Sequence, residues 1–133
     1  MSPEAKKPTV TAKVMVVDDD PDVVLLLNKV LSRRGYEVVS SLSGEEAIEK
    51  VLEVKPDIIF MDIMMPTMNG WEAAKAIKEN EKTRHIPIVF LSVRKEPEDI
   101  EKSLKYAHAD AHIGKPINFN KLYEIIEKYT QAS

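Results

Sequence analysis

The chain has 133 residues, 19 of them basic and 22 acidic, and its formal net charge is -3. This length suits one domain with a substantial core and is too short for two ordinary domains, so no second catalytic or DNA-binding domain is expected. A small negative net charge does not favour binding to nucleic acid. The absence of cysteine excludes disulfides and thiolate chemistry.

No apolar run approaches the roughly 20 residues of a membrane span, and the first residues lack the apolar stretch of a signal peptide. The sequence therefore predicts a cytoplasmic protein with no membrane partner. Residues 1–12 are polar and show no periodicity, which predicts a flexible leader. Residues 13–130 are predicted to form one domain, and residues 131–133 a tail.

Five short apolar runs predict strands within this domain. They begin at Val14, Val38, Ile58, Ile88 and Ala111. The first, third and fourth runs are almost continuously apolar, which is typical of parallel strands covered by helices on both faces.

Amphipathic stretches with helix-start signals lie between the strands. Asp20 followed by Pro21 predicts the first helix, which Gly35 terminates. Its predicted buried residues are Val23, Leu26, Leu27, Val30 and Leu31. Ser43 and Glu46 form a capping-box pair at the start of the second helix, whose predicted buried residues are Ala47, Ile48, Val51 and Leu52.

The remaining three helices follow the third, fourth and fifth strands. The third begins at Asn69, with Glu72 three residues later, and its predicted buried residues are Trp71, Ala74 and Ile77. The fourth follows Pro97, with Ile100 and Leu104 predicted buried. The fifth follows Asn118, and its predicted buried residues are Leu122, Ile125, Ile126 and Tyr129. Five βα units predict an α/β fold with a doubly wound sheet and a ligand site at the carboxyl ends of the strands.

Chemically active residues follow the strands at that predicted edge. They are Asp18, Asp19 and Asp20 after the first strand, Asp62 after the third, Ser92 after the fourth, and Lys115 with Pro116 after the fifth. A cluster of carboxylates favours a hard divalent cation, which predicts Mg²⁺, with Mn²⁺ as an alternative. A carboxylate beside such an ion can attack phosphorus and form an acyl phosphate.

Four segments in this order and spacing resemble response-regulator receiver domains of two-component signalling: VVDDDPDV, PDIIFMDIMMPTMNG, PIVFLS and GKPI. The resemblance covers roughly Lys13 to Tyr129 and implies a flavodoxin-like fold with strand order 2-1-3-4-5. It implies that Asp62 is the phosphoacceptor. Asp18, Asp19 and Asp62, with the backbone carbonyl of Met64, would bind the metal.

The resemblance also implies how the signal is formed and passed on. Ser92 and Lys115 would contact the phosphoryl oxygens, and the Lys115–Pro116 peptide bond would be cis. Ser92 and His112 would form a switch that reaches the surface of the fourth helix, fifth strand and fifth helix. The donor would be a phosphohistidine on a sensor histidine kinase or a histidine phosphotransfer protein, and the output an unidentified protein.

The protein is thus interpreted as a stand-alone signalling receiver, with self-phosphotransfer and slow autodephosphorylation as its only reactions. Met64 and Val93 are more apolar than the residues common at these positions in the family. Because apolar side chains beside the acceptor would exclude water, they predict a comparatively long-lived aspartyl phosphate.

Two other functions could use the acidic run at Asp18, and a third class of protein could share the fold. A calcium loop beginning at Asp18 fails, because its sixth and twelfth positions hold Val23 and Lys29. A haloacid-dehalogenase-type phosphatase would use Asp18 as nucleophile and Asp20 as acid, and it is kept as the alternative, although the late paired-acid motif is missing. An interaction module without phosphorylation would lack one of the site residues, all of which are present. Asp20 and Asp22 are better explained as helix caps.

Overall fold

The centre of the fold is a sheet of five parallel strands in the order β2-β1-β3-β4-β5. The computed structural model describes residues 12–130. The strands are β1 (Lys13–Val17), β2 (Glu37–Ser41), β3 (Ile58–Met61), β4 (Ile88–Ser92) and β5 (Ala111–Gly114). The predicted strand order is confirmed, and β1, β3 and β4 are the central strands, buried at every residue except Lys13.

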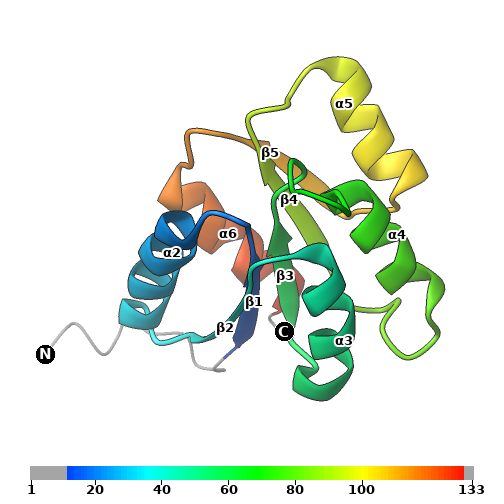
Figure 1. Ribbon diagram of the computed structural model, residues 1–133. Helices are drawn as coiled ribbons and strands as arrows, with labels where there is room; N and C mark the ends of the chain where they lie inside the picture. The colour runs from blue at the N-terminus through cyan, green and yellow to red at the C-terminus, as the bar shows by residue number, and fades with distance from the viewer. Residues whose placement is uncertain (1–11, 131–133) are drawn as a thin grey trace, which may run out of the picture.

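Helices cover both faces of the sheet (Figure 1). They are α2 (Pro21–Arg33), α3 (Gly44–Val54), α4 (Gly70–Glu79), α5 (Pro97–Glu101) and α6 (Phe119–Thr130), and α5 continues as a π-helix, η1 (Lys102–Tyr106). Residues of α2 and α6 pack on one face of the sheet, and residues of α3 and α4 on the other. Within the described residues, no helix is long and apolar enough to cross a membrane.

The folded part begins slightly earlier than predicted. Ala12, at the end of the predicted leader, is buried in the core beside Val14 and Tyr36, and its carbonyl accepts a hydrogen bond from the Glu37 amide at 3.0 Å. The rest of the predicted leader, and the tail at residues 131–133, lie outside the described residues.

Side-chain caps begin three of the helices where the sequence predicts. The Asp20 carboxylate accepts a hydrogen bond from the Asp22 amide at 2.9 Å. Asn69 and Glu72 form a complete capping box at α4. At α3 the Ser43 hydroxyl accepts from the Glu46 amide, but the Glu46 carboxylate accepts from Leu42 rather than from Ser43. The Asp20 cap begins α2 directly after Asp18 and Asp19, whereas α4 begins eight residues after Asp62.

Three of the predicted buried leucines are exposed. Leu26 and Leu52 are about half exposed because α2 and α3 turn only a narrow stripe toward the sheet, which holds Leu27 and Leu31 in α2 and Val51 in α3. Leu104 is 42% exposed. In η1 the Ala107 amide donates to the Lys102 carbonyl, five residues back. This wider turn rotates the helix, so that Ser103 rather than Leu104 faces inward.

Gly70 lies where the start of α4 approaches the backbone behind Asp62. A Cβ at this position would collide with the Asp62 carbonyl oxygen and come within 2.9 Å of the Ile63 Cα. Since both obstacles are backbone atoms, they cannot move aside independently. We expect Gly70→Ala to lower the free energy of unfolding by about 3 kcal/mol, measured by urea denaturation.

Gly44 provides the matched control, because it also occupies the first position of a helix. A Cβ there would come within 3.1 Å of the Ala73 Cβ and 3.2 Å of the flexible Met68 side chain, but its three nearest atoms include no backbone atom. Gly44→Ala should therefore cost much less than Gly70→Ala. Equal losses in the two variants would show that the close approach behind Asp62 is not the cause.

Candidate functional site

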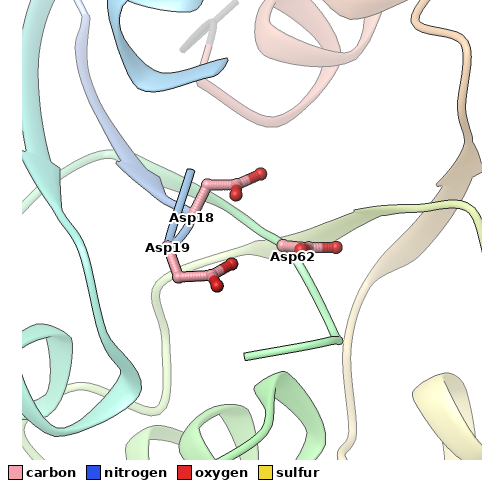
Figure 2. Close-up of side chains that lie close together, drawn as sticks. All are labelled: Asp18, Asp19 and Asp62. Carbon is pink, nitrogen blue, oxygen red and sulfur yellow. The ribbon is translucent and has the colours of Figure 1, made fainter. Parts of the chain in front are cut away.

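Three carboxylates meet at the carboxyl ends of β1 and β3. Backbone bonds extend the sheet by one residue at this point: the Asp18 amide donates to the Ser41 carbonyl at 3.2 Å, and the Asp62 amide donates to the Val17 carbonyl at 2.9 Å. As a result, one carboxylate oxygen from each of Asp18, Asp19 and Asp62 lies within 4.8 Å of the other two. Figure 2 shows the three carboxylates turned to the same side. The predicted convergence of these three residues is thus present in the structure.

The three carboxylates differ in their surroundings. Asp18 is 4% exposed and Asp62 is 9% exposed, whereas Asp19 is open to solvent. The Asp18 Oδ1 accepts a hydrogen bond from the Asp20 amide at 3.0 Å. The Asp62 Oδ1 accepts one from the amide of Ile63 at 2.9 Å. Each buried carboxylate is therefore held by the backbone through one oxygen, and within the described part of the chain its second oxygen accepts no backbone hydrogen bond.

Lys115 brings a positive charge to the two buried carboxylates. Its Nζ lies 3.2 Å from the Asp18 Oδ2 and 3.9 Å from the Asp62 Oδ1. The Lys115 amide donates to the Ser92 carbonyl at 2.9 Å, which ties the loop after β5 to the end of β4. The peptide bond between Lys115 and Pro116 is cis, as the resemblance implies.

The electrostatic environment disfavours a charged Asp62. Burial, followed by the negative charge of Asp18, raises the pKa of the Asp62 carboxyl from 3.8 to about 6, while Lys115 and the Ile63 amide act in the opposite direction. A positive charge brought close to Asp62 would therefore stabilise its charged form. One ammonium group is not enough to balance three acids.

The donor set fits a hard divalent cation. All three side chains offer oxygen, the ligand type preferred by Mg²⁺, and their oxygens lie close enough together for one ion to contact them. An ion at this position would also relieve the repulsion that raises the pKa of Asp62. The residues present therefore fit Mg²⁺.

Of the other predicted site residues, Ser92 is buried, whereas Met64 and Val93 are exposed. Ser92 is fully buried, and its Oγ accepts a hydrogen bond from the Arg94 amide at 3.0 Å. Within residues 12–130, no hydrogen bond joins the Ser92 hydroxyl to Asp62. The side chains of Met64 and Val93 are 52% and 66% exposed.

His112 is held by hydrogen bonds at both ring nitrogens. Its Nδ1 lies 2.8 Å from the Ser103 Oγ, and its Nε2 lies 2.7 Å from the Arg94 carbonyl oxygen. Its ring also packs beside Phe90, with 6.3 Å between the ring centroids.

The sequence gives no signal for Arg94, which connects several parts of the site. Its guanidinium donates two hydrogen bonds to the buried Asp99 carboxylate, at 3.0 and 3.2 Å. It also approaches the Met64 sulfur at 3.8 Å and lies 5.1 Å from the centre of the Trp71 ring. Only the position of Arg94, two residues after Ser92, could have drawn attention to it.

The structure weakens the phosphatase alternative. That mechanism needs Asp20 as an acid beside Asp18, but the Asp20 carboxylate is exposed and caps α2. Asp20 also lies outside the group of three carboxylates that could hold a metal. Its role as a helix cap, which the sequence favours, explains its contacts fully.

Comparison with known proteins gives consistent matches. The family model described as "Response regulator receiver domain" matches residues 14–127. The polar-differentiation response regulator DivK of Brucella ovis is 34% identical over 119 residues, which span 90% of this chain and 96% of that protein.

Solved structures agree with these sequence matches. The chemotaxis protein CheY4 of Vibrio cholerae superposes with a TM-score of 0.83 at 30% identity, covering 90% of this chain and 99% of that one. The response regulator TrrA of Thermotoga maritima, solved in complex with Mg²⁺ and beryllium fluoride, superposes with a TM-score of 0.79 at 32% identity, with the same coverage.

Proposed function

Because the chain belongs to the response regulator receiver domain family, we propose that Asp62 is the residue that takes up the phosphoryl group. The observation that carries this proposal is the pairing of Asp62 with Lys115 at 3.9 Å beside the carboxylates of Asp18 and Asp19. Asp18 is already bonded to Lys115 at 3.2 Å, and Asp19 faces solvent. Asp62 is therefore the buried carboxylate whose second oxygen is best placed to attack.

The proposed reaction moves a phosphoryl group from a phosphohistidine to Asp62. An Asp62 carboxylate oxygen forms the new bond to phosphorus, and the bond between phosphorus and the histidine nitrogen breaks. The histidine leaves with the bonding electron pair and can then take a proton from solvent. The Lys115 ammonium pairs with the phosphoryl oxygens, and the Ser92 hydroxyl donates a hydrogen bond to them after it turns toward Asp62.

Asp18, Asp19 and Asp62, together with the backbone carbonyl of Met64, are the proposed ligands of Mg²⁺. The ion, when bound, would supply positive charge to the transferring oxygens. Mn²⁺ offers the same charge to the same oxygen ligands and is proposed as a substitute. The proposed donor is a sensor histidine kinase or a histidine phosphotransfer protein, and a cytoplasmic location stays a prediction.

Incubation with acetyl phosphate tests the proposed reaction without a partner protein. Intact mass should show one added phosphoryl group per chain when Mg²⁺ is present. No phosphoryl group should be added when a chelator has removed the metal beforehand, because the three carboxylates would then repel the incoming anion. Labelling that is equally fast with and without Mg²⁺ would contradict the proposed metal dependence.

Met64 and Val93 are proposed to prolong the phosphorylated state. Both residues are exposed and apolar, Met64 two residues after Asp62 and Val93 one residue after Ser92, and the Arg94 guanidinium approaches the Met64 sulfur at 3.8 Å. We expect Met64→Asn combined with Val93→Ala to speed dephosphorylation by about tenfold, or about 1.4 kcal/mol of activation free energy. The measurement is the loss of labelled protein with time after the donor is removed.

Leu52→Asn is the control, because Leu52 is also an exposed apolar residue but lies on α3 beside Pro56 and Pro87. Its dephosphorylation rate should match that of the wild type. If the double variant also keeps the wild-type rate, Met64 and Val93 do not limit the access of water.

A further inference from the structure

A pocket of about 580 Å³ lies at the amino-terminal edge of the sheet. Its lining residues belong to the segments 51–57 and 82–87, together with Tyr129 near the end of α6. These segments lead into the parallel strands β3 and β4, whose other ends carry Asp62 and Ser92, so the pocket and the carboxylate cluster lie at opposite edges of the sheet. Figure 1 shows the end of α3 and the loop after α4 on the lower side of the view. We call this hollow the basal pocket.

The inner wall of the basal pocket is apolar. Val51 in α3 and Ile86 before β4 are buried in the core, and Leu52 adds an apolar side chain that is 40% exposed. Pro56 and Pro87 contribute rings whose backbone φ angle is fixed, so the walls need little rearrangement to receive a ligand. The volume also lies within the range of roughly 300–1,000 Å³ that is usual for small organic ligands.

Unpaired positive charge surrounds this apolar wall. Lys55 and Lys82 are both exposed, and within residues 12–130 neither ammonium group pairs with a carboxylate or donates a hydrogen bond. His85 adds a ring N–H to the lining. The carboxylate in the lining is that of Asp57, and it accepts a hydrogen bond from the Lys13 amide at 2.7 Å. Two ammonium groups against one bonded carboxylate favour an anionic ligand.

The backbone of the basal pocket favours a carboxylate over a phosphate. Phosphate sites in proteins usually present several free backbone amides to the ligand. Here five amides of the lining already donate hydrogen bonds within the protein, those of Lys55, Asp57, Lys82, Thr83 and Ile86. The ammonium groups of Lys55 and Lys82 are therefore the main donors left, and two such groups match the two oxygens of a carboxylate.

We propose that the basal pocket binds a small organic acid with an apolar, aromatic body. The rings lie against Val51, Leu52 and Ile86, and the carboxylate lies between the ammonium groups of Lys55 and Lys82. Burial of apolar surface supplies most of the binding free energy, and the two lysines select an acid over a neutral molecule of the same shape. This site does not depend on the proposed function of Asp62, because the two sites share no residue and lie at opposite edges of the sheet.

The probe is 2-naphthoate, which joins two fused apolar rings to one carboxylate. Amide NMR spectra of the ¹⁵N-labelled protein follow its titration. We expect saturable shifts in the segments 51–57 and 82–87, with a dissociation constant of about 1 mM or below, the usual range for so small a ligand. The neutral analogue 2-naphthamide should bind roughly 2- to 30-fold more weakly, because it loses two exposed ion pairs.

Single substitutions separate the charges from the apolar wall. Lys55→Gln and Lys82→Gln should each weaken the binding of 2-naphthoate by roughly 1.5- to 5-fold and leave that of 2-naphthamide unchanged. Leu52→Asn removes an apolar contact and should weaken the binding of both probes by the same factor. Lys121→Gln is the control, because it changes the net charge equally at an exposed position of α6 outside the pocket, and it should alter neither affinity.

Three results would overturn the proposal. Shifts that do not saturate, or that map to the groove lined by Lys29, Arg33 and Tyr123 between α2 and α6, would show that the basal pocket is not the site. Equal affinities for 2-naphthoate and 2-naphthamide would show that the pocket does not select acids. Tighter binding of 2-naphthyl phosphate than of 2-naphthoate would contradict the assignment of a carboxylate.

Discussion

Asp62→Asn should stabilise the metal-free protein, and the gain should depend on pH. In the folded state the pKa of the Asp62 carboxyl is about 6, above its ordinary value of 3.8, so the folded protein holds this proton more tightly than the unfolded chain. Stability is therefore lost as pH rises from about 4 to 6, and the loss stays constant at higher pH. An asparagine at position 62 carries no charge at any pH, so the Asp62→Asn variant does not lose this stability as pH rises.

The expected gain is about 1–3 kcal/mol at pH 8, because two pKa units correspond to nearly 3 kcal/mol, and it should shrink toward zero near pH 4. Urea denaturation of both proteins across this pH range measures it. Glu53→Gln, an exposed acid on α3, should change stability by less than about 0.5 kcal/mol at every pH. A stability difference for Asp62→Asn that does not vary with pH would contradict the raised pKa.

Lys115→Met should slow phosphorylation by about 10²- to 10³-fold, the usual effect of removing one preorganised partner of a developing anion. The substitution keeps a long apolar side chain but removes the Nζ that lies 3.2 Å from Asp18 and 3.9 Å from Asp62. The measurement is the initial rate of labelling by acetyl phosphate at saturating Mg²⁺.

Lys95→Met is the matched control for Lys115→Met. The Lys95 ammonium donates to the Lys115 carbonyl oxygen rather than to a carboxylate of the site. Its loss should leave the labelling rate within about threefold of the wild type, or less than 0.7 kcal/mol of activation free energy. If Lys115→Met labels as fast as Lys95→Met, the ammonium of Lys115 does not assist phosphoryl transfer.

Much of the fold could be predicted because its signals are local in the sequence. The apolar runs of β1, β3 and β4 and the caps at Asp20, Ser43 and Asn69 each lie within a few residues of the element they define. The carboxyl ends of parallel strands meet at one edge of the sheet. This rule alone was enough to place Asp18, Asp19 and Asp62 together.

The attachment of α5 and η1 could not be predicted in the same way. The spacing of Ile100 and Leu104 indicates an ordinary amphipathic helix, but the π-turn rotates Ser103 inward and leaves Leu104 exposed. Hydrogen bonds join Trp71 to Ser103 across 32 residues and Ser103 to His112 across nine. No local sequence pattern marks such contacts, because they depend on how α4, η1 and β5 pack together.

The identity of the phosphorylated residue can be measured directly by reducing the labelled protein with borohydride. This reagent converts an aspartyl phosphate to an alcohol, and peptide mass mapping then locates the changed residue. After labelling with acetyl phosphate and Mg²⁺, we predict the change at position 62 and no labelling of Asp62→Asn. A changed residue at Asp18 or Asp20, with labelling that survives Asp62→Asn, would contradict the receiver mechanism and favour the phosphatase one.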